Sequence, residues 1–434
     1  MNRRLLTALA ASLLASTAAN AQPVAITGGT VALGDGSAPI ENGVVIVDNG
    51  RIIAAGSAGS VGVPAGATML DASGKWVSPG LVAPFSRIGL AEVDLSADGS
   101  DDSGIGDSVH SAAIDVTWSV NPAASPIAVA RADGVTRAVV APSPGSHIFS
   151  GQGAVIDTAT DYDPVTKARA FQLVYLGESG AYLAGGSRSG SVVELRDGLR
   201  RAMGEGAYRD LPDDSLLTGA DIEALKPVVE GRMPMMVVAN RAVDIVNLLR
   251  LKSEFRNLDL ILLGAAEGHL VADRIAAAGV PVIVEPTQNR PGSFESLAST
   301  QSNAGRMVAA GVDVSAAQIN DFVNRAAQNG RQMAGNLVAL TKLPGHQGVS
   351  WGQAFAMVTS KPAAMIGMDG EIGVLAPGAR ADVVLWSGDP LELTSHAERV
   401  WIDGVEQSLE NRQTALARRY RSLQRESLPK AYRR

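Results

Sequence analysis

WVSPGLVAPFSRIGL, residues 76–90, begins a pattern of short apolar runs separated by turns that continues to about residue 364. Helix-like stretches lie between several of the runs, including RAVDIVNLLRLKSEF and HLVADRIAAAG. Parallel strands that are buried on both faces read as nearly continuous apolar runs. Eight such runs with intervening helices predict an α/β fold of the (β/α)8 TIM-barrel type. The seven later runs are GVTRAVVAP, GAVIDTA, AFQLVYLG, MPMMVVA, LDLILLG, VPVIVEP and VDVSAA.

The two flanks of this central part have a different pattern. Both alternate short apolar runs with Gly, Asp and Asn, which is typical of short strands joined by turns. The segment DNG at residues 48–50 is a hairpin signal, and ERVWIDGVEQ near the other end reads as a second hairpin. We therefore predict a small composite β-sandwich formed by both chain ends, residues 22–75 and 368–408, beside a barrel of residues 76–367.

Residues 1–21 have the pattern of a secretory signal peptide. Arg3 and Arg4 precede a brief apolar run, and Ala19-Asn20-Ala21 is a small-x-small cleavage site. We expect cleavage after Ala21 and a periplasmic or secreted protein. The alternative is a buried N-terminal helix.

Composition excludes several classes of function. The chain has 434 residues, with 37 basic against 44 acidic side chains and a net charge of −7, which becomes −9 without the two leader arginines. This balance argues against nucleic acid as a partner, because nucleic-acid binding needs a basic face. There is no cysteine, so thiolate metal sites and cysteine nucleophiles are excluded. No segment after the leader reads as a membrane span.

Two charged segments carry further hypotheses. The acidic run of residues 91–107 reads as a solvated loop near the barrel mouth, with calcium binding as the alternative, although its spacing does not match an EF-hand. Residues 409–434 read as a basic helical tail. Its apolar stripe predicts a helix that docks one face on the body, and the alternative is a helix that binds a partner or a membrane surface. The stripe consists of Leu409, Leu416, Tyr420 and Leu423.

Several stretches together resemble one family, the amidohydrolase superfamily and in particular its imidazolonepropionase-like branch. They occur in the family's order and include ITGGTVALGDGSAPIENGVVIVDNGRIIAAG, VSPGLVAP, DGVTRAVVAPSPGSHIFSGQGAVI, GAAEGHLVADRIAAAGVPVIVEP, AMVTSKPAAMIGM and IGVLAPGARADVVLWSGDPLE. The resemblance implies the same barrel and composite sandwich. It also implies hydrolysis of C–N bonds by water activated on one or two divalent metals such as zinc.

The resemblance also places the family's metal ligands, and other residues stand there. The His-x-His pair of the first barrel strand falls on Phe85 and Arg87. The histidines of strands 5 and 6 fall on Val238 and Leu263, and the strand-8 aspartate falls near Ile319, before Asn320 and Asp321. No lysine occurs in AFQLVYLGE, where the bridging lysine of strand 4 would stand. We therefore expect neither a metal nor another cofactor.

No other catalytic pattern replaces this set. The five histidines are not spaced as HxH or HExxH, and His269, which follows Glu267, reads as a polar residue at a helix start. There is no G-x-S-x-G motif of a serine hydrolase, no P-loop and no G-x-G-x-x-G motif. The remaining histidines are His110, His147, His346 and His396.

Three functional hypotheses remain open. The first is a superfamily member without the usual metal-dependent catalysis, which binds a small ligand or supports an active paralogue. Arg87 and Arg241 suit a ligand carboxylate, whereas the structural alternative for Arg87 is an ion pair with Glu178 or another barrel carboxylate. The second is a hydrolase of non-peptide C–N bonds with an atypical site. The third is an interaction protein that acts through its tail, as a homo-oligomer or in a complex. The candidate ligand-binding residues are Arg87, Glu178, Arg241 and Glu267.

Overall fold

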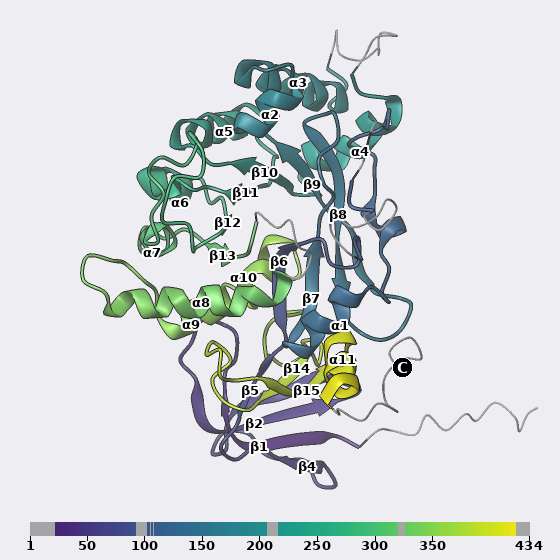
Figure 1. Cartoon of the computed structure of the whole chain (residues 1–434), viewed down its shortest axis with the longest axis vertical. Coiled ribbons are helices and arrows are strands. Elements are labelled where there is room, and N and C mark those ends of the chain that lie inside the picture. The colour runs from purple at the N-terminus through teal and green to yellow at the C-terminus, as the bar shows by residue number, and fades with distance from the viewer. Residues whose placement is uncertain are drawn as a thin grey trace, which may run out of the picture.

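The barrel sheet occupies the upper half of the molecule in Figure 1. The structure is a computed structural model that describes residues 22–92, 102–104, 106, 108–205, 216–319 and 326–421. Residues 1–21, which are expected to form a signal peptide, and most of the acidic run lie outside these residues. Eight strands in the order β6 to β13 form the barrel sheet, which confirms the predicted fold class. They are β6 (Leu81–Ser86), β7 (Val135–Val140), β8 (Phe149–Asp157), β9 (Val165–Tyr175), β10 (Met235–Ala239), β11 (Leu260–Gly264), β12 (Val282–Val284) and β13 (Val314–Ala316).

One strand departs from the (β/α)8 pattern. β8 pairs antiparallel with both β7 and β9, whereas the other neighbouring strands pair in parallel. A helical crossover between β8 and β9 is impossible, because only residues 158–164 separate them and a parallel connection needs about a dozen residues or more. The expectation of eight equivalent parallel strands is therefore wrong at this position.

The barrel closes through a segment outside the regular strands. The amide of Val82 in β6 donates to the carbonyl of Val358 at 2.8 Å, and the amide of Ala316 in β13 donates to the carbonyl of Met357 at 3.1 Å. Residues 357 and 358 therefore bridge the first and last strands. The interior below the mouth is filled by buried apolar side chains such as Val82, Met236 and Ile283.

Most of the described helices cover the outside of the barrel, while Ala363 and Met365 of α10 pack in the interior cluster. RAVDIVNLLRLKSEF forms one of them, as predicted, and buries Ile245, Leu248 and Leu251 on one face. The helices are α1 (Ser125–Ala132), α2 (Gly177–Leu183), α3 (Arg188–Ala202), α4 (Gly219–Val229), α5 (Ala242–Glu254), α6 (Ala272–Ala277), α7 (Asn303–Ala309), α8 (Gly330–Ala339), α9 (Trp351–Ala356), α10 (Ser360–Met365) and α11 (Arg412–Arg421). Short 3-10 turns are η1 (Val116–Ser119), η3 (Gly268–Val271), η4 (Ala326–Asn329) and η5 (Leu340–Lys342).

The two chain ends share a second sheet, below the barrel in Figure 1. Its order is β16-β15-β14-β5-β1-β2-β3, with β4 beside β1. Both predicted hairpins form, and Asn49-Gly50 and Asp403-Gly404 turn them with positive φ. The strands are β1 (Val24–Val31), β2 (Ile40–Asp48), β3 (Arg51–Ser57), β4 (Thr68–Asp71), β5 (Trp76–Pro79), β14 (Val383–Trp386), β15 (Ala397–Ile402) and β16 (Val405–Gln407).

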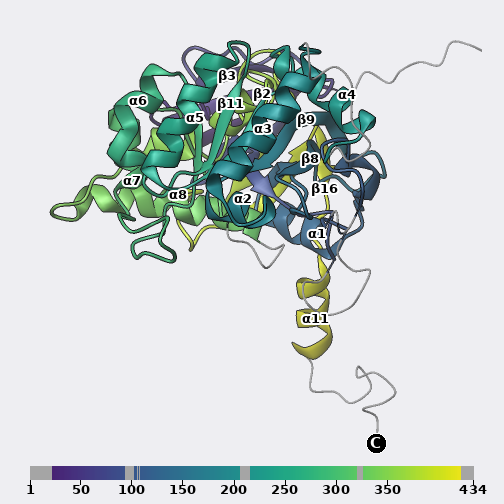
Figure 2. The ribbon, with the colours of Figure 1, turned by 90° about the horizontal axis from the view of Figure 1, so that it is seen from above.

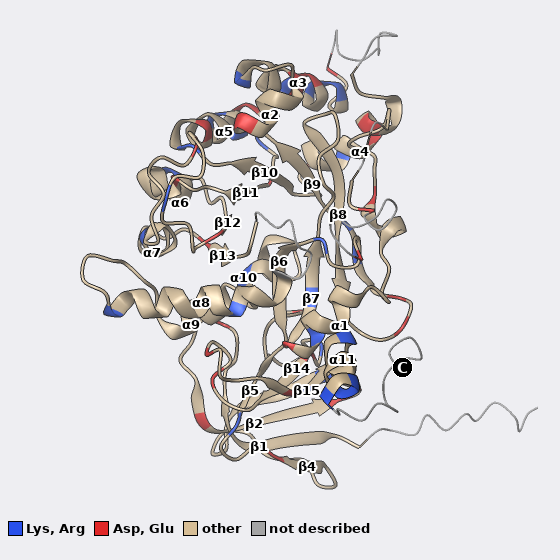
Figure 3. Ribbon diagram, viewed as in Figure 1, with Lys and Arg blue, Asp and Glu red and all other residues tan. Residues whose placement is uncertain are grey.

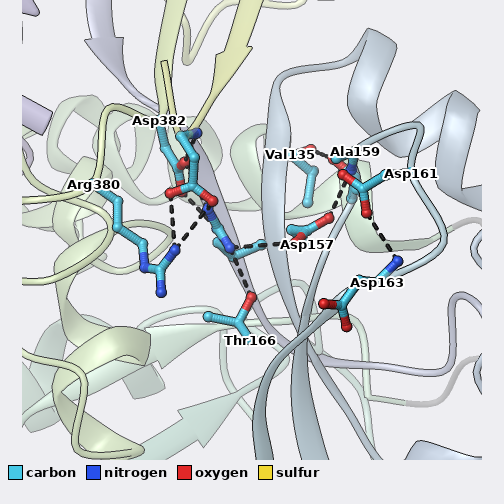
Figure 4. Close-up of polar contacts among 11 residues, drawn as sticks. Val135, Asp157, Ala159, Asp161, Asp163, Thr166, Arg380 and Asp382 are labelled. Carbon is cyan, nitrogen blue, oxygen red and sulfur yellow. Dashed lines mark hydrogen bonds and ion pairs between the residues drawn. The ribbon is translucent and has the colours of Figure 1, made fainter. Parts of the chain in front are cut away.

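A buried ion network joins this sheet to the barrel. Arg137 of β7 donates from Nε and Nη2 to the Asp382 carboxylate at 2.7 and 2.9 Å, and from Nη2 to Asp403 at 2.8 Å. Figure 4 shows Asp382 on one side of the network and Asp157 and Thr166 of the barrel on the other. Although burial disfavours its charge, the Asp382 and Asp403 carboxylates raise the pKa of Arg137.

The last described helix, α11, projects from the body rather than docking along it. Figure 2 shows it leaving the side of the molecule that carries α1. Leu409 packs against the core and Leu416 is half-buried, whereas Tyr420 is exposed, so the predicted docking of the stripe is wrong for Tyr420. Leu423 lies outside the described residues. Among the described helices, none has the length and apolar character that crossing a membrane requires.

Candidate ligand site at the barrel mouth

A cavity of about 640 Å³ opens at the carboxyl ends of the barrel strands. In barrel folds this end carries the functional loops, because each strand delivers its next residues there. The cavity is lined from the ends of β6, β9, β10 and β11 and by the loop between β12 and α7. Its volume is in the range that holds a small organic molecule, about 300–1,000 Å³.

The described positions that the resemblance assigns to metal ligands meet in this cavity, whereas Asn320 and Asp321, beside the strand-8 position, lie outside the described residues. Val238 of β10 and Leu263 of β11 are register partners, which places them side by side at the mouth. Phe85 comes from β6, and Ile319 follows β13. Tyr175 ends β9, where the family's lysine strand ends. The cavity is lined by Phe85, Arg87, Tyr175, Val238, Leu263 and Ile319.

These residues do not fit a divalent metal. Four of them offer only hydrocarbon, and the guanidinium of Arg87 is a permanent cation that repels a metal ion. The Glu285 carboxylate accepts from the Ile319 amide at 3.3 Å and from Gln288 Nε2 at 3.2 Å. Within the described part of the chain, no three His, Asp or Glu side chains gather as a metal-binding group. The described residues at these positions therefore supply no donor set for the metal centre that the resemblance implies.

Arg87 lies against two aromatic rings. Its guanidinium carbon is 6.0 Å from the centre of the Phe85 ring. Burial raises the pKa of Tyr175, and the charge of Arg87 and its hydrogen bond to the phenol oppose that rise. Arg87 and Tyr175 therefore present a cation and a hydroxyl above an apolar floor. A ligand anion next to this pair would be stabilised, because the surrounding hydrocarbon lowers the local dielectric constant.

A second group of charges holds one wall of the cavity. Glu295, in the loop after β12, accepts the backbone amide of Glu178 and Arg188 Nη2, the latter at 2.9 Å. Arg188 also lies 3.5 Å from the Asp244 carboxylate. Glu178 and Glu295 both line the cavity. The contacts of Glu295 therefore fix the loop after β12 against the start of α2 and α3.

The other two candidate residues lie outside the cavity lining. Arg241 precedes α5, where its Nη2 donates to Asp244 Oδ1 at 2.8 Å. Glu267 is buried and accepts the amides of Ala242 at 3.0 Å and Ala298 at 3.2 Å. Both residues therefore organise the loops behind the mouth.

Asn303 was missed by the sequence reasoning, which singled out its neighbour His269. The Asn303 Oδ1 accepts the His269 amide at 2.9 Å and lies 3.3 Å from His269 Nδ1, while its Nδ2 donates to the carbonyl of Ala265 at 2.9 Å. Burial lowers the pKa of His269. Of the described lining residues none is a histidine, whereas Asn303 is part of the wall. Tyr175 and Glu285 were also missed, although each ends an apolar run at a position where strand ends meet.

Comparisons with known proteins agree with the fold. The model of the amidohydrolase family matches residues 265–406. Amidohydrolase tasK of Hapsidospora irregularis is 24% identical over 384 residues, which are 80% of this chain but only 38% of that protein. A crystal structure of an amidohydrolase from Thermotoga maritima is similar, with 24% identity, a TM-score of 0.76, and coverage of 88% of this chain and 99% of that one. A zinc-bound adenosine deaminase from Xanthomonas campestris gives 16% identity and a TM-score of 0.53, with coverage of 92% and 98%.

Proposed function

Because the chain belongs to the amidohydrolase superfamily, we propose that its barrel mouth binds a small organic carboxylate without the superfamily's metal-dependent hydrolysis. One observation carries this proposal. The described positions implied for metal ligands line one cavity and hold hydrocarbon side chains, the Tyr175 phenol and the Arg87 guanidinium. The fold thus keeps the pocket, and at these positions it offers the cation of Arg87 to an organic anion, while the carboxylates of Glu178, Glu285 and Glu295 belong to other parts of the wall.

The lining residues suit a ligand that has a charged part and an apolar part. Arg87 suits a carboxylate, because a guanidinium donates two parallel hydrogen bonds to that group. Phe85, Val238 and Leu263 suit an apolar substituent, which would displace water from the floor. The Tyr175 hydroxyl is a further donor beside Arg87. The proposed ligand class is therefore a carboxylate with an aryl or branched alkyl group.

Calorimetry with matched probes tests this function. N-acetylphenylalanine and 3-phenylpropionate should bind, and their uncharged amides should bind at least tenfold more weakly. Arg87→Met should weaken the carboxylates about 10- to 100-fold, because a hydrogen bond to a charged group contributes about 1.5–3 kcal/mol. Arg250→Met is the matched control, since this arginine is exposed on α5, lies outside the lining and should leave binding unchanged.

Two outcomes contradict the proposal. One is equal binding of each carboxylate and its amide, or unchanged binding by Arg87→Met. The other is zinc-dependent hydrolysis of N-acetylphenylalanine by the wild-type protein, which would favour the hydrolase hypothesis. The leader pattern of residues 1–21 supports export as part of the same proposal. Its test is the N-terminus of the protein isolated from its native cells, which should be Gln22.

A further inference from the structure

We propose that α11 is a dimerisation arm that docks on the β8–β9 loop, residues 158–164, of a second copy of this chain. The proposal is independent of the ligand at the barrel mouth. It rests on the exposure of α11, on its charge, and on the position of the loop next to the root of the helix.

The exposure of α11 indicates a missing partner. Its ten residues include none that is buried, and Tyr420 is 52% exposed. Leu416 and Tyr420 are four residues apart and therefore share one face of the helix. The described turns of α11 bury no residue on their own chain, whereas helices in proteins are stabilised mainly by packing of an apolar face. In Figure 2 the ribbon of α11 points away from the described body beyond its root.

The positive charge of α11 favours a partner with an acidic surface. α11 carries four arginines and no acid, and it is seen as a blue segment in Figure 3. Residues 411–434 hold 8 of the 37 basic and one of the 44 acidic side chains, so this segment has a charge of +7 and the rest of the chain −14. An acidic protein surface therefore attracts it. The described apolar face, formed by Leu416 and Tyr420, is narrow for a membrane-surface helix, which buries a broad stripe of large apolar side chains.

The β8–β9 loop offers a matching surface. Tyr162 is 86% exposed and stands between the exposed side chains of Asp161 and Asp163. Asp161 is held in a turn by accepting the Asp163 amide at 2.9 Å. Aspartates on both sides of an exposed ring complement arginines on both sides of Leu416 and Tyr420. The ring adds apolar area and a face on which a guanidinium can stack.

The root of α11 lies beside this loop in the same copy. Arg131 donates from Nε to the carbonyl of Ser408 at 2.9 Å and from Nη1 to the carbonyl of Thr158. The Thr160 hydroxyl lies 3.4 Å from Gln407 Oε1. A two-fold axis next to this root would let each α11, about 15 Å long, cross to the loop of the other copy. Such an exchange uses the same two surfaces twice and closes as a dimer.

The test is the mass of the protein in solution, by sedimentation at about 50 mM salt and again at 500 mM. We expect a dimer at low salt, with a dissociation constant that is at least tenfold larger at high salt. Arg418→Glu with Arg419→Glu should give a monomer, and so should Asp161→Arg with Asp163→Arg. All four changes combined in one chain should restore the dimer, because the charges again oppose each other. Arg250→Glu with Arg256→Glu, on and beside α5, is the control that should remain dimeric.

Several results would overturn the proposal. The proposal is wrong if the wild-type protein is a monomer at 100 µM. It is also wrong if the Arg418→Glu/Arg419→Glu variant is still a dimer. Failure of the fourfold variant to dimerise, with its circular dichroism and melting temperature unchanged, would exclude the loop as the docking surface. Sedimentation with vesicles containing anionic lipid, lost on the Arg418/Arg419 reversal but unaffected at Asp161 and Asp163, would assign α11 to a membrane surface instead.

Discussion

Replacing Arg137 by methionine should destabilise the protein by about 3–5 kcal/mol, the usual cost of breaking a buried ion pair by removing one partner. The side chains of Arg137 and Asp382 are each 1% exposed. Arg137 makes three hydrogen bonds to carboxylates, two to Asp382 and one to Asp403, and a fourth to the Thr166 hydroxyl at 2.7 Å. Methionine keeps much of the apolar stem but leaves the Asp382 carboxylate buried without its cation.

The double variant Arg137→Met/Asp382→Leu separates lost charge pairing from lost packing. If the uncompensated carboxylate causes the loss, removing it should recover at least about 1 kcal/mol, because a buried pair replaced by apolar residues is often neutral or better. Denaturant unfolding followed by circular dichroism measures both variants. Hydrogen exchange should rise first in residues 379–407, since the network ties that end of the second sheet to β7. A loss below about 1 kcal/mol in the single variant would refute this reasoning.

Two further predictions concern buried carboxylates. Burial raises the pKa of Asp157 to about 6, so the folded state binds its proton more tightly than the unfolded chain, and stability falls as pH rises from about 4 to 6. The free energy of unfolding of Asp157→Asn should therefore exceed that of wild type by about 3 kcal/mol at pH 7.5, and the two should be equal at pH 4. A difference in the free energy of unfolding that does not change with pH would contradict this. Asp221 is fully buried and accepts the amides of Ser111, Ala113 and Thr218 at 2.9 Å each. Asp221→Ala should cost about 3 kcal/mol or more in thermal unfolding, and a loss within 0.5 kcal/mol would show that these amides find other partners.

The strands of the barrel follow from the sequence because each is an apolar run bounded by turn residues. The direction of β8 does not follow from its composition, since GAVIDTA is equally suited to either direction. The decisive signal is the length of the connection. The stretch TATDYDP between β8 and β9 is too short for a crossover, whereas the hairpin at Asn49-Gly50 is recognised from its turn residues.

The mouth of the barrel could be placed only through the resemblance, because Phe85, Val238 and Leu263 look like core residues by themselves. Tyr175 and Asn303 were missed for another reason. Their role depends on which strand ends meet in space, and periodicity does not encode this. Arg241 and Glu267 were expected near a ligand because they follow strands, but local partners hold them outside the cavity lining.

The measurement that tests the central claim most directly is the metal content of the purified protein. The wild-type chain is dialysed against a micromolar excess of zinc, separated from free ion, and analysed for zinc and protein in the same sample. A lining of hydrocarbon and guanidinium at the ligand positions predicts well below 0.1 zinc per chain, and the same value for Arg87→Met. One or two tightly held zinc ions per chain, located at the barrel mouth by anomalous diffraction, would contradict the account.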